Sequence, residues 1–336
     1  MVPADSIMEA NQGQEAAPPL LRVDETGAGL RADIYLFREL SLVSRTRVRQ
    51  KVQTGEALLN GHRFSTATRL RAGDEVRIHW RSEPPPAAAP PLTVLYEDAY
   101  LLVVDKPAGM AVHPAGGRQS GTLVQAARER CRATIRARLE HGDSSFYPTL
   151  VNRLDAPTSG IVLLALTRPV HKALQAMNAA RLIDKEYLAL VEGLVPEEEG
   201  LIDLPIGPSR DSRVRLKMSC RTDGRESRTR FQVIRRFAAH TLLRAFPVTG
   251  RQHQLRVHFA ATGHPVTGDL LYRDESLFLA ALRSGAGAPP PRLCLHALRM
   301  TLAHPVTGRP LTVEAAIPED LAEAMWSATG EEAQVP

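Results

Sequence analysis

The chain has 336 residues, of which 43% are hydrophobic and 5% aromatic, and this composition is typical of a globular protein rather than a disordered or fibrous one. No apolar run approaches the roughly 18 residues that a membrane-spanning helix needs, and the first twenty residues lack the charge and apolar core of a secretory signal. Cys131, Cys220 and Cys294 are widely separated, so we expect neither a disulfide framework nor a zinc site. These features predict a monomeric, cytoplasmic protein without a membrane partner.

The positive charge is concentrated in one short segment. The net charge of the chain is +5, and residues 30–80 alone contain ten Lys or Arg against five Asp or Glu. A compact basic segment suggests a polyanionic partner such as RNA, although charged runs are also found on ordinary solvated surfaces. Residues 1–29, which precede it, are rich in Ala, Pro, Gln and Asn and are expected to be disordered.

Residues 30–80 are predicted to form a small independent domain. Apolar residues recur at helical spacing over 34–40, and a second helix is expected over 45–53, with Ser44 as its N-cap. The pair Asn60-Gly61 suits a tight turn and predicts a hairpin over 57–64, followed by a strand that ends at Ile78. The second helix would carry four cations, Arg45, Arg47, Arg49 and Lys51.

This order of elements resembles the alpha-L RNA-binding domain, first described in a small-subunit ribosomal protein. The residues that carry the resemblance are SRTRVRQKVQTGEALLNG and LRAGDEV. The resemblance implies that the arginine-bearing helix faces RNA phosphates.

The rest of the chain is predicted to be a Pro/Ala-rich linker (81–92), one large domain (93–325) and a flexible tail (326–336). Helices are expected over 123–138 and 170–180. Short β-like runs outnumber them, which favours an α+β fold with a mixed, largely antiparallel central sheet. These runs are 93–96, 101–104, 161–166, 187–191, 229–234, 241–246 and 311–315.

Two polar segments of the large domain are candidates for chemistry. In the first, Arg153 and Asp155 lie just before a turn and a buried strand, where Asp155 is either a catalytic carboxylate or a turn cap. The second holds Arg251, Gln254 and Arg256 among histidines, and alternation would place Gln254 and Arg256 on one side of an extended chain. The histidine spacing fits no zinc site that we recognise, so we expect a surface that faces phosphate or carboxylate, and no metal.

Four blocks in order resemble the RluA-type pseudouridine synthases. The blocks are DKPAGMAVHPAGG, which starts at residue 105, NRLDAPTSG, which starts at 152, TGRQHQLRVHFAATGHPVTGD, which starts at 249, and LCLHALRMTLAHPVTG, which starts at 293. The resemblance implies a mixed sheet with a catalytic cleft, and isomerisation of uridine to pseudouridine in structured RNA without metal or cofactor.

The resemblance also implies roles for single residues. By position, Asp155 matches the catalytic aspartate, Arg256 the arginine that pairs with it, and Tyr187 the tyrosine that stacks on the target base. Arg153 matches the arginine that fills the space left by a flipped base, and Leu295 an apolar residue of the pocket. We further expect Gln254 and Asn152 to contact the substrate.

Asn152 is the one departure from the family pattern, which has His at this position. An amide donates and accepts hydrogen bonds but carries no proton, so Asn152 would serve if the position only supports the loop, the role that we favour. The RNA target is expected to be large-subunit ribosomal RNA by analogy, with transfer RNA as the alternative. A non-catalytic RNA-binding or ribosome-assembly protein on the same fold is the competing hypothesis.

Overall fold

The computed structural model describes residues 20–25, 27–39, 45–79, 91–113, 121–140, 145–283 and 291–331. Ser44 and nearly all of the expected linker lie outside these ranges. The chain divides into two compact units, one formed by Met1–Pro86 with Leu139–His141 and the other by Ala87–Arg138 with Gly142–Pro336. Among the described residues, no helix is both long and apolar enough to cross a membrane.

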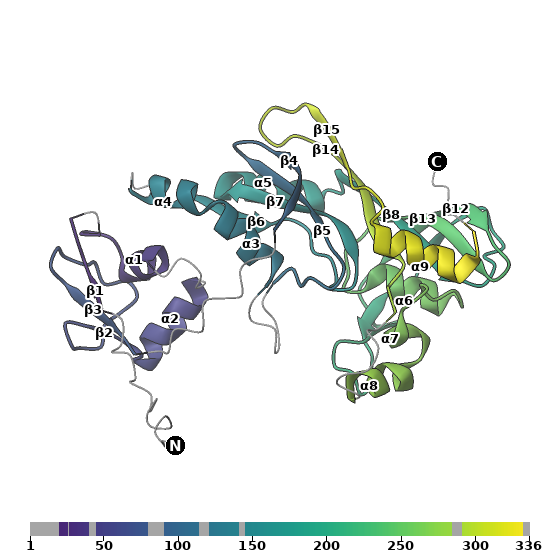
Figure 1. Ribbon diagram of the computed structural model, residues 1–336, viewed down its shortest axis with the longest axis horizontal. Helices are drawn as coiled ribbons and strands as arrows, with labels where there is room; N and C mark the ends of the chain where they lie inside the picture. Colours follow the sequence, from purple (N-terminus) through teal and green to yellow (C-terminus); the bar gives the residue numbers. More distant parts are fainter. Residues whose placement is uncertain are drawn as a thin grey trace, which may run out of the picture. The chain divides into compact units, whose positions relative to one another are not determined.

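The smaller unit packs two helices on a three-stranded antiparallel sheet. The helices are α1 (Ala32–Glu39) and α2 (Arg45–Thr54), and the strand order is β1 (Leu20–Arg22), β3 (Glu75–Ile78), β2 (Ala57–Leu59) (Figure 1). Its core is built from the residues Val23, Tyr35, Leu36, Val48, Val52, Leu70, Val76 and Ile78.

Two expectations for this unit were wrong. Strand β1 lies inside the segment expected to be disordered, because Leu21 pairs with Val76 of β3. The Asn60-Gly61 turn forms, with φ of 49° and 82°, but it closes only a single Leu59–His62 bridge rather than a hairpin. The true partner of β2 is β3, more than fifteen residues further along the chain.

The larger unit is built around a ten-stranded sheet, as expected mixed and largely antiparallel (Figure 1). The main order is β4-β5-β7-β14-β8-β13-β12-β9, with β6 added beside β7 and β15 beside β14. The strands are β4 (Thr93–Glu97), β5 (Leu101–Lys106), β6 (Phe146–Leu150), β7 (Ser159–Thr167), β8 (Ile183–Glu192), β9 (Glu199–Asp203), β12 (Arg228–Arg236), β13 (His240–Pro247), β14 (Leu295–Ala303) and β15 (Pro310–Glu314).

Seven helices of the described residues and a small hairpin complete this unit. The hairpin pairs β10 (Ile206–Pro208) with β11 (Met218–Cys220). The helices are α3 (Leu123–Arg130), α4 (Arg132–Glu140), α5 (Arg168–Ala179), α6 (Gln254–Ala261), α7 (Leu270–Arg273), α8 (Glu275–Arg283) and α9 (Glu319–Thr329).

Two boundaries in this unit also differ from expectation. The polar segment before Ala261 is helical from Gln254 onward, so Gln254 and Arg256 do not alternate along a strand. Helix α9 continues to Thr329 and buries Leu321 and Met325 against β8 and β13, so the domain extends past residue 325. The apolar side of α9 explains why this end of the chain is ordered.

One parallel contact joins the two halves of the large sheet. Strand β14 lies between β7 and β8 and pairs with β7 through only two residue pairs, His296–Ser159 and Ala297–Gly160. Gly160 has φ of 109°, and a Cβ built on it would lie 2.3 Å from the carbonyl oxygen of Ala297. Only glycine therefore allows β7 and β14 to approach this closely.

We predict that Gly160→Ala destabilises the protein. The substitution combines a backbone conformation that alanine avoids with an overlap against the Ala297 backbone, so the free energy of unfolding should fall by about 3 kcal/mol or more. Urea unfolding measures it. Gly250→Ala is the matched control, because a Cβ there meets no atom within 4 Å, and equal stability of the two variants would contradict the prediction.

Candidate active site

Asp155 lies on the loop that leads into β7, and Asn152 fixes the start of that loop. The Asn152 amide nitrogen donates to the Ile161 carbonyl at 3.1 Å, and its oxygen accepts the Leu163 N–H at 2.8 Å. The side chain thus makes the pair of hydrogen bonds to β7 that the backbone of a neighbouring strand would make. It supports the loop in this way, as favoured from the sequence. The side chain is buried and both its groups bind the backbone of β7, so the structure gives Asn152 a support role, and its contact with the substrate stays a prediction.

Lys106 holds the same loop through its buried amine. The side chain is fully buried, and Nζ donates to the carbonyls of Pro107 at 2.9 Å, Met110 at 2.9 Å and Ala156 at 3.0 Å. Burial lowers the pKa of Lys106 to about 7, while the charge of Asp155 opposes this shift. The amine therefore ties the residue after Asp155 to the end of β5, a role that no pattern in the sequence indicates.

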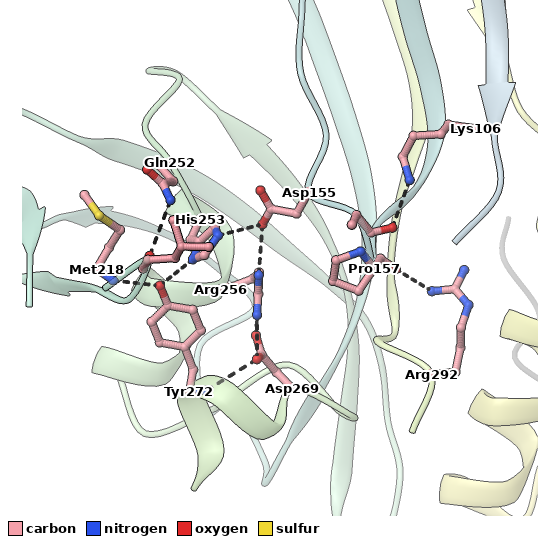
Figure 2. A network of polar contacts seen from close by, with 12 residues as sticks. Lys106, Asp155, Pro157, Met218, Gln252, His253, Arg256, Asp269, Tyr272 and Arg292 are labelled. Atoms are coloured by element: carbon pink, nitrogen blue, oxygen red, sulfur yellow. Dashed lines mark hydrogen bonds and ion pairs between the residues drawn. The ribbon is translucent and has the colours of Figure 1, made fainter. Parts of the chain in front are cut away.

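Arg292 ties the far end of the loop to β14 and α9. Its guanidinium donates to the Pro157 carbonyl at 3.3 Å (Figure 2). It also donates to Ser159 Oγ at 2.6 Å and pairs with Asp320 of α9 at 2.6 Å. Together with Lys106 and Asn152, it leaves the backbone around Asp155 little freedom to move.

Asp155 faces a buried arginine that a second carboxylate holds in place. Arg256 Nη1 donates to Asp155 Oδ2 at 3.1 Å (Figure 2). The other side of the guanidinium binds Asp269 in a bidentate manner, at 2.6 Å through Nε and 2.9 Å through Nη2. Burial works against the charge on Arg256, but the hydrogen bonds and charges of Asp269 and Asp155 outweigh it and raise its pKa. Arg256 is therefore a permanent cation beside Asp155.

His253 and Tyr272 form a second contact to Asp155. His253 Nε2 lies 3.8 Å from Asp155 Oδ2, and His253 Nδ1 lies 2.7 Å from the Tyr272 hydroxyl (Figure 2). The hydroxyl also accepts the backbone N–H of Met218 at 3.0 Å. Neither these residues nor Asp269 was assigned a role from the sequence. The sequence held one signal for these residues: an Asp three positions before Tyr272 is typical of a helix N-cap, and Asp269 does cap α7 by accepting the Tyr272 N–H.

The structure places Tyr187 and Leu295 on neighbouring strands. Tyr187 lies opposite Ala297, two residues from Leu295, so both side chains belong to one face of the sheet. Both are buried, and burial raises the pKa of Tyr187, to which the charge of Asp155 adds. Arg153 is exposed at the start of the Asp155 loop. A pocket that these three residues form beside Asp155 stays a prediction.

Gln254 does not belong to that pocket. Its amide nitrogen donates to the Arg228 carbonyl at 2.9 Å and Thr229 Oγ1 at 3.1 Å. Its oxygen accepts from the Thr249 hydroxyl at 2.7 Å and the Arg251 N–H at 3.0 Å. All four hydrogen-bonding positions of the amide are occupied, so the expectation that Gln254 binds substrate was wrong. It fixes the loop before α6 to β12.

A cavity of about 650 Å³ is lined by residues such as Phe231, Leu243 and Phe259, and contains none of the predicted site residues. Within the described ranges, no group of three or more His, Cys, Asp or Glu side chains is arranged to hold a metal ion.

Comparisons with known proteins identify the family. The family model described as RNA pseudouridylate synthase matches residues 100–261. The chain is 37% identical to "Ribosomal large subunit pseudouridine synthase D" of Xanthomonas campestris over 94% of this chain and 95% of that relative. The chain belongs to the RluA-type pseudouridine synthases. It is therefore an isomerase that converts uridine to pseudouridine in RNA, and the resemblance of the four sequence blocks is confirmed.

Two further similarities agree. The chain is 34% identical to "Ribosomal large subunit pseudouridine synthase C" of Escherichia coli, over 88% of this chain and 91% of the relative. Among solved structures, the human "RNA Pseudouridylate Synthase Domain Containing 4" matches with a TM-score of 0.50 and 25% identity, over 69% of this chain and 91% of that one.

We predict that Lys106→Met lowers both stability and activity of this synthase. Methionine fills the space of the lysine stem but leaves three carbonyls without a donor, each at about 1–3 kcal/mol, and releases the Asp155 loop. Urea unfolding and the rate of pseudouridine formation report the two effects. Lys172→Met, at an exposed position, is the control. Wild-type stability in Lys106→Met would show that the amine does not fasten the loop.

Proposed function

We propose that this synthase modifies uridine in large-subunit ribosomal RNA, in the cytoplasm and as a monomer, with Asp155 as the catalytic carboxylate. The observation that carries the catalytic assignment is the state of the carboxylate: Arg256 binds Oδ2, whereas no hydrogen bond of the described residues engages Oδ1. The names of the relatives in Xanthomonas campestris and Escherichia coli support the choice of RNA.

The roles follow from the bonds that change. The N1–C1′ bond of uridine breaks and a C5–C1′ bond forms, while one proton leaves C5 and one joins N1, so the isomerisation consumes no co-reactant. We therefore propose it without cofactor or metal. Asp155 either attacks the nucleotide covalently or assists departure of the base. Both roles need an ionised carboxylate, and the Arg256 guanidinium lies 3.1 Å from Asp155 Oδ2 to balance its charge.

Tyr187, Leu295 and Arg153 would receive the base. A uridine stacked in RNA must turn out of its helix before Asp155 reaches it. Stacking on Tyr187 would return about 1–3 kcal/mol of that cost, and Leu295 would supply an apolar wall on the same sheet face. The exposed Arg153 is placed to fill the space that the base leaves.

A basic segment beside the site supports RNA as the substrate. Residues 209–228 contain seven Lys or Arg and three Asp or Glu. The segment contacts the neighbours of His253: the Met218 N–H donates to the Tyr272 hydroxyl, and the Gln252 amide donates to the Leu216 carbonyl. Three of its cations are exposed and have no ion pair within the described part of the chain: Arg213, Arg215 and Arg225.

The N-terminal unit would add a second contact to RNA, as an alpha-L domain. On α2, Arg49 pairs with the buried Asp33 at 3.2 Å and Lys51 pairs with Glu56. The Arg49 side chain is nevertheless half exposed, so it both stabilises the unit and presents charge to solvent. Arg45 and Arg47 lie on the same helix, and we propose that all four cations attract phosphates.

We predict that Asp155→Asn abolishes pseudouridine formation and leaves RNA affinity within about threefold, because the amide keeps the shape of the carboxylate but cannot take up its charge. Sequencing that maps pseudouridine in total RNA, from cells that carry each form or none, measures turnover and names the target. Asp184→Asn, at an exposed position, is the control.

Turnover by Asp155→Asn would overturn the catalytic assignment. A modified position in transfer RNA instead of the large subunit would overturn the proposed target alone. If the intact protein modified no RNA while binding it, the non-catalytic alternative would be correct.

We predict that replacing Arg213, Arg215 and Arg225 together with Gln weakens RNA binding and flattens its dependence on salt. For every phosphate that the variant no longer neutralises, the slope of log K against log salt should fall by about 0.7–0.9. Filter binding at several salt concentrations measures the slope, with Arg309→Gln as a control at an exposed position far along the chain. An unchanged slope would show that this segment does not contact phosphates.

A further inference from the structure

We propose that His253, fixed by Tyr272, is a positioning residue that decides which oxygen of Asp155 reacts: Oδ2 is held by Arg256 and His253, and Oδ1 is presented to the nucleotide. This inference rests on the proposed catalytic role of Asp155. No role for His253 or Tyr272 follows from that assignment alone.

The two oxygens of Asp155 have different surroundings. Two nitrogen atoms converge on Oδ2, Arg256 Nη1 at 3.1 Å and His253 Nε2 at 3.8 Å (Figure 2). The second distance is longer than a hydrogen bond, but a shift below about 1 Å would close it. No described residue donates to Oδ1, although the carboxylate remains partly open to solvent at 26% exposure. Rotation of the carboxylate would break the contacts to Oδ2, so the two oxygens do not exchange freely.

The tautomer of His253 follows from its partners. The Tyr272 hydroxyl already accepts the Met218 N–H, and its own proton has only His253 Nδ1 as an acceptor within the described residues. If Tyr272 donates to Nδ1, the proton of a neutral imidazole lies on Nε2 and points at Asp155. The opposite tautomer would turn a nitrogen lone pair toward a carboxylate and leave the phenol proton unbonded.

The charge states of both partners are consistent with this arrangement. Burial lowers the pKa of His253, with Asp155 and Asp269 opposing and Arg256 adding to the effect, which favours the neutral ring. Burial raises the pKa of Tyr272, so the phenol keeps the proton that it donates. Tyr272 also lies with its ring 5.1 Å from Arg256 Cζ, so one side chain contacts both groups that hold Oδ2.

The backbone shows that His253 is held in an unusual place. It precedes α6 in the left-handed region, with φ of 55° and ψ of 20°, a conformation that few residues other than glycine adopt. In this conformation the imidazole lies between the Tyr272 hydroxyl and Asp155 Oδ2, and it contacts both.

The first test measures the tautomer of His253 and does not depend on catalytic turnover. In full-length protein labelled with ¹⁵N, long-range ¹H–¹⁵N correlations distinguish the two imidazole tautomers, and the His253 signals are identified by their loss in His253→Gln. We expect the Nε2–H tautomer in the wild type and a mixture in Tyr272→Phe, which keeps the ring but removes the hydroxyl. An Nδ1–H tautomer in the wild type, or one unchanged by Tyr272→Phe, would overturn the proposal.

Kinetics form the second test, through release of tritium from RNA labelled at C5 of uridine under single-turnover conditions. We expect rates reduced about 10-fold to 100-fold in His253→Ala and Tyr272→Phe, a smaller loss in His253→Gln because its amide N–H can replace Nε2–H, and unchanged RNA affinity. Tyr100→Phe is the matched control, since no hydrogen bond of its hydroxyl is formed within the described residues. Thermal melting verifies that each variant is folded.

The outcomes separate this proposal from the function on which it rests. If Asp155→Asn is inactive while Tyr272→Phe and His253→Ala keep the wild-type rate, the positioning role fails and the catalytic carboxylate stands. If Asp155→Asn is active, the catalytic role itself fails. Equal losses in His253→Gln and His253→Ala would contradict a role for the Nε2–H group.

Discussion

The contact between Asp155, Arg256 and Asp269 is the constraint on which the site depends. Three charges lie in direct contact, and the cation between the carboxylates is almost completely buried. A buried charge is costly unless its partners compensate for lost water, and Asp269 does so through two parallel hydrogen bonds. Arg256 can then donate from Nη1 to Asp155 without further reorganisation. The cation beside Asp155 is thus supplied by the folded domain and not by the loop alone.

The rigidity of the Asp155 loop has a different origin. Asn152, Lys106 and Arg292 each bind backbone groups, and they do so from the loop itself, from the end of β5 and from the segment before β14. Backbone ties of this kind fix the position of the Cα atom, while Arg256 and His253 act only on the carboxylate. The protein therefore separates the placement of Asp155 from the orientation of its carboxylate. Electrostatic effects that are organised in advance in this way need no movement during the reaction.

The sequence predicted the pair of charged residues at the site better than it predicted the residues that hold the surrounding loops in place. The pairing of Asp155 with Arg256 was expected from the family blocks and is observed across 101 residues. The support role of Asn152 was favoured from the sequence, but the role of Gln254 was missed, because an amide reveals its partners only in three dimensions and those of Gln254 include residues of β12. The start of α6 was missed because His253 begins it in a left-handed conformation that no propensity indicates.

Short or late elements escaped prediction for a related reason. Strand β1 has three residues and exists only because β3, over fifty residues away, supplies its hydrogen bonds. Helix α9 is ordered by the apolar surface of β8 and β13, which its own sequence does not contain. In both cases contacts with residues distant in the sequence determine the structure, and the local sequence pattern does not indicate those contacts.

The insertion of β14 between β7 and β8 gives the enzyme an order of assembly. Asp155 lies on the loop before β7, in the half of the sheet that is synthesised first, whereas Tyr187 on β8 and Arg256 on α6 follow later. Strand β14 (Leu295–Ala303) joins the two halves and is synthesised after all three residues. The two halves therefore cannot be joined through β14 until nearly the whole domain has been made. The pairing at Gly160 is the contact that completes the sheet.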